Sequence, residues 1–84
     1  MTELEYDILD ELYFLTDFQT LVNELCITNE VVVAQLYTLI EKGWVKVLEG
    51  EVEVEIENKD LFYKKYNNYN YLATKAGLLA HNSR

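Results

Sequence analysis

The stretch that most limits the possible folds covers residues 21–45, LVNELCITNEVVVAQLYTLIEKGWV. Its apolar side chains recur at helical spacing and so form one stripe on a helix. The stripe consists of Val32, Leu36, Leu39 and Ile40. Gly43 follows and is expected to end the helix, because glycine readily adopts the left-handed conformation of a helix C-terminus. Thr28 is the expected N-cap, so residues 26–28 form a short corner between this helix and a shorter one before it.

The same reasoning predicts three further helices, over residues 2–15, 16–25 and 74–81. Thr2 and Thr74 supply the hydroxyl that an N-cap requires, and the second helix is expected to start from Thr16 or Asp17. The chain contains no proline and no low-complexity linker. With 84 residues, it is therefore predicted to form a single domain over residues 1–84.

Beyond the third helix the pattern changes to a period of two, in which valine and isoleucine alternate with charged residues. This alternation predicts strands with one buried face. Gly50 interrupts it as a bulge or a turn. Residues 58–60 give the next turn signal, and residues 61–72 are rich in aromatic residues that favour strands. We therefore expect a long two-stranded hairpin with its tip at residues 58–60, in which Lys64 and Lys65 lie opposite glutamates of the first strand.

Together these features resemble the helix-turn-helix of winged-helix proteins, the fold of many small bacterial transcription regulators. The resemblance is carried, in chain order, by Leu25, Ile27, Thr28, Val32, Leu36, Leu39, Gly43, Trp44 and Val45. It covers nearly the whole chain and implies an α+β winged helix-turn-helix, with a three-helix core, a long two-stranded antiparallel wing and a short C-terminal helix. The same fold also serves as a protein-interaction module, so the resemblance does not assign an activity by itself.

The resemblance implies duplex DNA as a partner, because in DNA-binding winged helices the exposed side of the third helix enters the major groove. The corresponding positions here are Asn29, Glu30, Val31, Val33, Ala34, Tyr37 and Thr38. The wing contacts expected from the family are Lys59, Lys64 and Lys65. None of the third-helix positions is basic, and the net charge of -8 repels phosphate at long range. DNA binding in transcription regulation is therefore expected from family resemblance only.

The third helix also supports a different hypothesis, because apolar residues lie on more than one of its sides. The residues outside the main stripe are Val31, Val33, Ala34 and Tyr37. Either this strip packs beneath another element, or it is exposed as a dimer or adaptor surface. The seven tyrosines add to such a surface, since tyrosine combines contact area with a hydrogen-bonding tip. The alternative is thus an acidic winged-helix module for protein-protein interaction or dimerisation that does not bind DNA.

The sequence offers little for catalysis or metal binding. Ser83 is the only serine and lies in the tail, and no glycine-rich phosphate loop is present. One cysteine and one histidine do not suffice for a zinc site, so neither enzyme activity nor a cofactor is expected. Cys26 is expected to be a small buried residue, and His81 a solvated helix-end residue. With no long apolar run and no signal-peptide pattern, the protein is predicted to be cytoplasmic.

Overall fold

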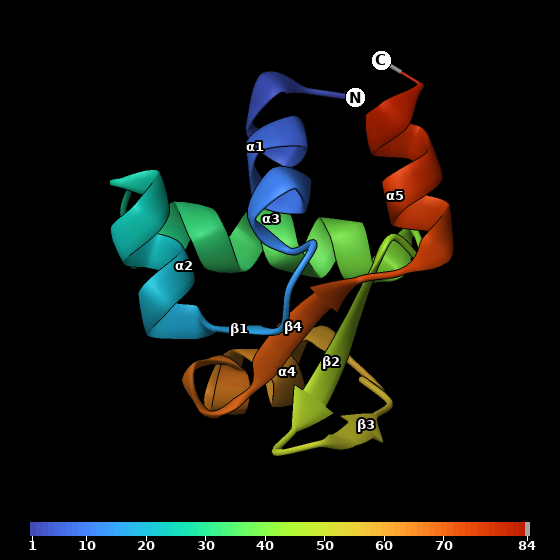
Figure 1. The fold of residues 1–84 in the computed structure, drawn as a ribbon. Helices are drawn as coiled ribbons and strands as arrows, with labels where there is room; N and C mark the ends of the chain where they lie inside the picture. Colours follow the sequence, from blue (N-terminus) through green and yellow to red (C-terminus); the bar gives the residue numbers. More distant parts are fainter. Residues whose placement is uncertain (84) are drawn as a thin grey trace.

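The computed structural model describes residues 1–83, and the elements in this part of the chain form an α+β fold of five α-helices, one short 3₁₀ helix and four strands (Figure 1). In chain order they are α1 (Glu3–Glu11), β1 (Thr16–Asp17), α2 (Phe18–Leu25), α3 (Asn29–Glu41), β2 (Val45–Glu49), β3 (Val52–Val54), α4 (Lys59–Lys65), η1 (Tyr66–Asn68), β4 (Asn70–Ala73) and α5 (Lys75–Asn82). The predicted α+β class and the corner between α2 and α3 are confirmed. The first helix ends at Glu11, four residues earlier than expected.

All four strands belong to one antiparallel sheet with the order β1-β4-β2-β3. β4 is the last strand along the described chain, but it lies between β1 and β2, so Tyr71 is opposite both Thr16 and Val47. Within residues 1–83, β3 pairs with β2 alone and forms one edge of the sheet. In Figure 1 the sheet lies below α1, α2 and α3, and α4 lies behind it.

The core fills the space between the helices and the sheet. Its completely or almost completely buried side chains are Ile8, Leu9, Leu12, Phe18, Leu21, Val32, Leu36, Leu39, Val47, Phe62 and Tyr71. The predicted stripe of α3 is confirmed, because it lies in this core and its last member, Ile40, packs half-buried against it. Burying a side chain of this size stabilises the fold by roughly 1.5–3 kcal/mol relative to leaving it exposed, so the core is the main source of stability.

Side-chain caps explain where the α-helices begin. At each start a side-chain oxygen accepts a hydrogen bond from the backbone N–H three residues later, at Thr2, Asp17, Thr28, Asn58 and Thr74. Thr2 and Glu5 complete the reciprocal capping box. At the end of α2, Cys26 adopts the left-handed conformation with a φ of 57°. This cysteine is exposed, so the expectation that it is buried is wrong.

The long two-stranded hairpin predicted for the second half of the chain is also wrong. Gly50, with a φ of 63°, forms a tight turn that joins β2 to β3. The segment expected to be the second strand begins instead with the helix α4. Lys64 and Lys65 therefore lie in the last turn of this helix and not opposite glutamates across a ladder.

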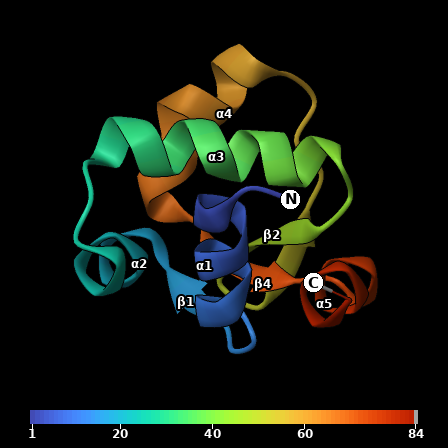
Figure 2. The same ribbon diagram turned by 90° about the horizontal axis from the view of Figure 1, so that it is seen from above.

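α4 forms because its ends and its middle both suit a helix. Asn58 caps it. Asp60 lies in its first turn and two lysines lie in its last turn, and both charges interact favourably with the helix dipole. In its middle, Phe62 is completely buried, and its ring centre lies 5.8 Å from that of Tyr37 on α3. Packing against α3 thus overrides the strand preference of the aromatic residues. Figure 2 shows α3 running between α4 on one side and α1 on the other.

α5 packs directly against the residues that lead into β2. Thr74 donates its N–H to the carbonyl of Trp44 at 2.9 Å and its hydroxyl to the carbonyl of Gly43 at 2.6 Å. Gly77 approaches the same segment so closely that a Cβ atom added to it would lie 2.1 Å from the carbonyl oxygen of Trp44. Glycine is therefore required here for close contact between a helix and the backbone beside it.

We predict that Gly77→Ala destabilises the protein, although Gly to Ala inside a helix ordinarily stabilises it by about 1 kcal/mol. The added methyl group collides with a backbone carbonyl that cannot rotate away, and overpacking of this kind costs about 1–3 kcal/mol. The measurement is urea unfolding of both proteins. Ala76→Ser, at the exposed neighbouring position, is the control and is expected to change stability by less than about 0.5 kcal/mol. A gain in stability for Gly77→Ala would contradict the close contact.

Candidate interaction surfaces

The exposed side of α3 is smaller and less apolar than the sequence indicated. The predicted contact residues that are exposed are Asn29, Glu30, Val31, Ala34 and Thr38. Val33 is buried, so its prediction as a contact residue is wrong. Tyr37 is half-buried and packs towards Phe62 of α4. The sequence left open whether the apolar residues outside the main stripe pack beneath another element or are exposed. Val33 and Tyr37 pack inside the structure.

The basic residue at the end of α3, Lys42, is held by two contacts. Its ammonium group forms an ion pair with the carboxylate of Glu5 on α1 and lies 4.7 Å from the centre of the Trp44 ring. Burial alone raises the pKa of Glu5, but the hydrogen bonds from Lys42 and from the Thr2 N–H outweigh it, and the pKa lies below its usual value of 4.5. Glu5 therefore stays ionised and draws Lys42 towards α1.

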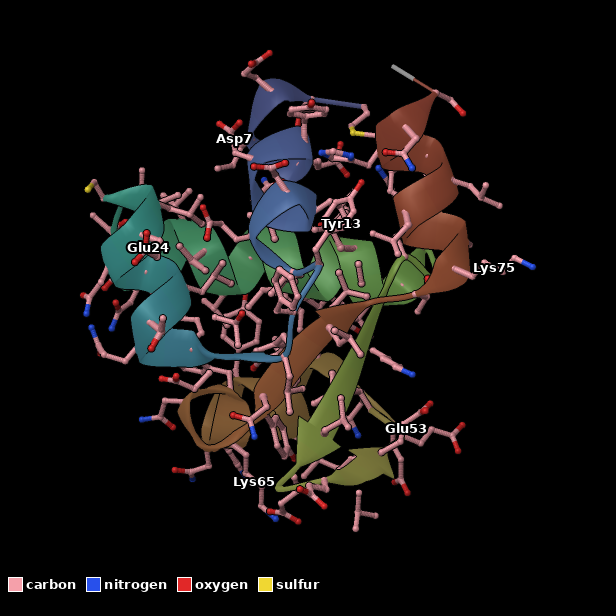
Figure 3. The ribbon with its side chains drawn as sticks, in the orientation of Figure 1. Asp7, Tyr13, Glu24, Glu53, Lys65 and Lys75 are labelled. Atoms are coloured by element: carbon pink, nitrogen blue, oxygen red, sulfur yellow. The ribbon has the colours of Figure 1, made fainter. Side chains whose placement is uncertain are left out.

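The three lysines predicted for the wing lie on α4, which corrects that prediction. Lys59 holds its ammonium group over two tyrosine rings, 5.6 and 6.0 Å from their centres, while Lys64 and Lys65 are exposed. In Figure 3, Lys65 lies at the lower end of the molecule and Lys75 at the side formed by α5. Lys65 and Lys75 therefore lie on different parts of the surface.

Three consecutive apolar residues between α1 and β1 are exposed: Tyr13, Phe14 and Leu15. We call them the apolar loop. Phe14, at its centre, is 80% exposed. Thr16 donates its hydroxyl to the carbonyl of Phe14 at 2.8 Å, which fixes the backbone of the loop. The Phe14 ring is thus presented to solvent by an ordered turn.

The apolar loop is attached to α5 through Tyr13. The Tyr13 hydroxyl donates to Oδ1 of Asn82 at 2.7 Å and lies 3.1 Å from Nδ1 of His81. The His81 ring stacks on Tyr6 of α1 with 4.1 Å between ring centres, and its Nε2 lies 3.3 Å from a carboxylate oxygen of Asp10. His81 is therefore buried between α1 and α5, and the expectation of a solvated helix-end residue is wrong.

An open hollow of about 430 Å³ lies beside this histidine and is lined by Glu3, Tyr6, His81 and Asn82. Within residues 1–83, no group of three or more histidine, cysteine, aspartate or glutamate side chains is placed to hold a metal ion. In the same part of the chain, every helix is too short or too polar to cross a membrane. The surfaces that stand out are therefore the exposed side of α3 and the apolar loop.

Sequence reasoning located α3 but missed the apolar loop and the buried histidine. The available signal for the loop was that Tyr13 and Phe14 do not fit on the same side of the first helix as its leucines. Nothing local predicts the burial of His81, because it results from the docking of α5 against α1.

No protein-family model matches the chain, and the comparisons with curated proteins and with solved structures found no match either.

We predict that Glu5→Gln destabilises the protein by about 1 kcal/mol at neutral pH, a modest value for a buried carboxylate, because its partner Lys42 is exposed and water screens the pair. Because the pKa of Glu5 is lowered by folding, its charge stabilises the folded state above the unfolded pKa, and this contribution is lost as the pH falls through the folded pKa. The difference between wild type and Glu5→Gln is therefore expected to shrink as the pH falls below 4.5, the usual pKa of glutamate, and through the lowered pKa of the folded state. Urea unfolding over a pH series measures it.

Asp7→Asn, at an exposed position of the same helix, controls for the loss of one negative charge. It is expected to leave the stability at neutral pH nearly unchanged. If Glu5→Gln and Asp7→Asn behave alike at every pH, the ion pair with Lys42 does not contribute to stability.

Proposed function

We propose that this chain is a cytoplasmic winged-helix-like domain that acts by binding another protein and has no catalytic activity of its own. The order of helix, short strand, two helices and strand supports the winged-helix assignment, as does the three-residue corner between α2 and α3. In this proposal the β2–β3 hairpin takes the place of the wing, and α4 is an insertion between β3 and β4.

The observation that carries the proposal is the apolar loop. Each of its three side chains exposes a large apolar surface to water, which costs free energy at roughly 25 cal/mol per Å². Three consecutive exposed apolar residues are typical of a contact with another protein. Tyr13 and Thr16 hold the loop in place, so little conformational entropy would be lost when a partner covers Phe14.

The electrostatics of α3 support a protein partner over DNA. No exposed residue of α3 itself is basic, and Lys42 at its end is paired with Glu5. Acidic groups also crowd between α1 and α2: burial, together with the charges of Glu24 and Asp10, raises the pKa of Glu11. Phosphate groups approaching these helices would meet repulsion and few donors.

A second candidate function, binding of duplex DNA, rests on one specific observation. Asn29 is the first residue of α3, is exposed, and follows the corner of the helix-turn-helix-like segment. Its amide is suited to reading adenine in the major groove, where the N-terminal residues of a recognition helix contact bases. Without basic residues beside it, this contact has little support from the phosphate backbone.

The experiment replaces Phe14 with the photo-reactive amino acid benzoylphenylalanine, which keeps an aromatic ring at the centre of the loop. Irradiation in cells is expected to give one discrete cross-linked product, identified by mass spectrometry as another protein or as a second copy of this chain. The same substitution at Glu24, exposed on α2 away from Tyr13 in Figure 3, is the control and is expected to give none.

A competition assay then tests the loop directly. An excess of wild-type protein should suppress the cross-link, whereas an excess of the Phe14→Ser variant should not. The stability of Phe14→Ser is expected to stay within about 0.5 kcal/mol of wild type, because the side chain is exposed. The contrary result is binding of purified protein to duplex DNA that weakens steeply with salt, combined with equal cross-linking at both positions. That result would replace the proposed function with the second candidate.

A further inference from the structure

β3 leaves one edge of the sheet open. Within residues 1–83 it pairs with β2 on one side, and no strand lies on its other side. Figure 1 shows β3 at the lower rim of the sheet, away from α1, α2 and α5. An open edge presents unpaired backbone N–H and C=O groups that can pair with a further strand. We call residues 52–57 the β3 edge.

The register shows which backbone groups face outward. A two-residue turn joins β2 to β3, with Glu49 opposite Val52 and Leu48 opposite Glu53. Residues that flank such a turn exchange hydrogen bonds with each other, and along an antiparallel ladder these pairs alternate with pairs whose backbone groups point away. Glu53 therefore directs its N–H and its C=O towards the open edge.

The side chains along this segment carry a dense negative charge. Every second residue is an exposed glutamate, at Glu51, Glu53, Glu55 and Glu57. No ion pair among the described residues involves any of them. A second copy of the same strand would place like charges opposite each other and be repelled. A strand that carries lysine or arginine at alternate positions would be attracted.

Apolar residues of the same segment provide a shaped surface beside the glutamates. Val54 and Ile56 are half-buried and line an open hollow of about 300 Å³. Ile40 and Val45 also line it, as do the charged residues Lys46, Glu53 and Glu55. Val52, next to the turn, is 71% exposed. A strand added along the edge can place alternate side chains over this apolar surface, as in other cases of β-strand addition.

We propose that the β3 edge binds an extended basic segment of another protein as a fifth strand. The backbone groups of Glu53 pair with the incoming strand. The lysine or arginine residues at alternate positions of that strand face the glutamates. Tyr13 and Glu53 lie far apart in Figure 3, so this surface is separate from the apolar loop and does not depend on the function proposed for that loop.

The test uses a fluorescein-labelled, seven-residue peptide in which lysine and valine alternate. Fluorescence anisotropy at low salt is expected to show saturable binding to the full-length protein. Hydrogen exchange followed by NMR is expected to show slower exchange of the Glu53 amide when the peptide is bound, because that N–H is then hydrogen-bonded. The apolar loop should show no change.

Two matched controls separate strand addition from simple charge attraction. A peptide of the same sequence with its internal backbone amides N-methylated keeps all charges but cannot pair as a strand. It is expected to bind weaker by on the order of tenfold, the equivalent of losing one or two hydrogen bonds. Glu53→Pro removes the outward N–H at an edge position that tolerates proline, and should weaken binding similarly. Glu53→Gln keeps the backbone donor and should weaken binding only slightly.

Equal binding of the N-methylated and unmethylated peptides would overturn the proposal, because it would show attraction to an acidic surface without strand pairing. Unchanged exchange of the Glu53 amide at saturation would overturn it as well. The peptide comparison requires no change in the protein, so it remains decisive even if Glu53→Pro disturbs the hairpin. Neither result bears on cross-linking at Phe14, which tests the separate apolar loop.

Discussion

The structure depends on covering a helix that is apolar on two sides. One side of α3 packs on the core beneath α1 and α2, and the other carries Val33 and Tyr37, which also need cover. Phe62 of α4 packs against Tyr37, with 5.8 Å between the ring centres, and its ring also stacks on that of Tyr69. This single contact explains why a helix interrupts what would otherwise be a simple hairpin.

The elements that the sequence predicted correctly are those set by local signals. The stripe of α3, the caps at Thr28 and Thr74 and the alternating residues of β2 each depend on side chains a few residues apart. The sequence predicts a strand at α4 because Phe62 and Tyr63 favour strands locally, whereas packing against Tyr37 of α3, distant in the sequence, decides its actual state. The Asn58 cap was the local signal in its favour, but a turn explains the same residue equally well.

The candidate surfaces were less predictable than the fold, because exposure depends on the final packing. Spacing along α3 correctly placed five residues on its outward side, but it did not show that Val33 is buried and Tyr37 half-buried; the five are Asn29, Glu30, Val31, Ala34 and Thr38. The apolar loop stands out only once α1 is known to end before Tyr13. The contacts of the charged residues also depend on packing: Lys42 pairs with Glu5 of another helix, and Lys59 lies over two tyrosine rings, and neither contact follows from spacing along the sequence.

The central position of β4 has a consequence for how the chain acquires its structure during translation. β1 has no strand to pair with until residues 70–73 emerge from the ribosome, and β2 has only its hairpin neighbour. The same strand also joins the end of α1, through a hydrogen bond of 2.9 Å from the Ala73 N–H to the Leu12 carbonyl. Contacts between such distant parts of a chain form slowly and late. A nascent chain of this protein therefore cannot cover the sheet-facing apolar side chains of its first three helices until residues 70–73 have been synthesised, and chaperones have access to those side chains during that time.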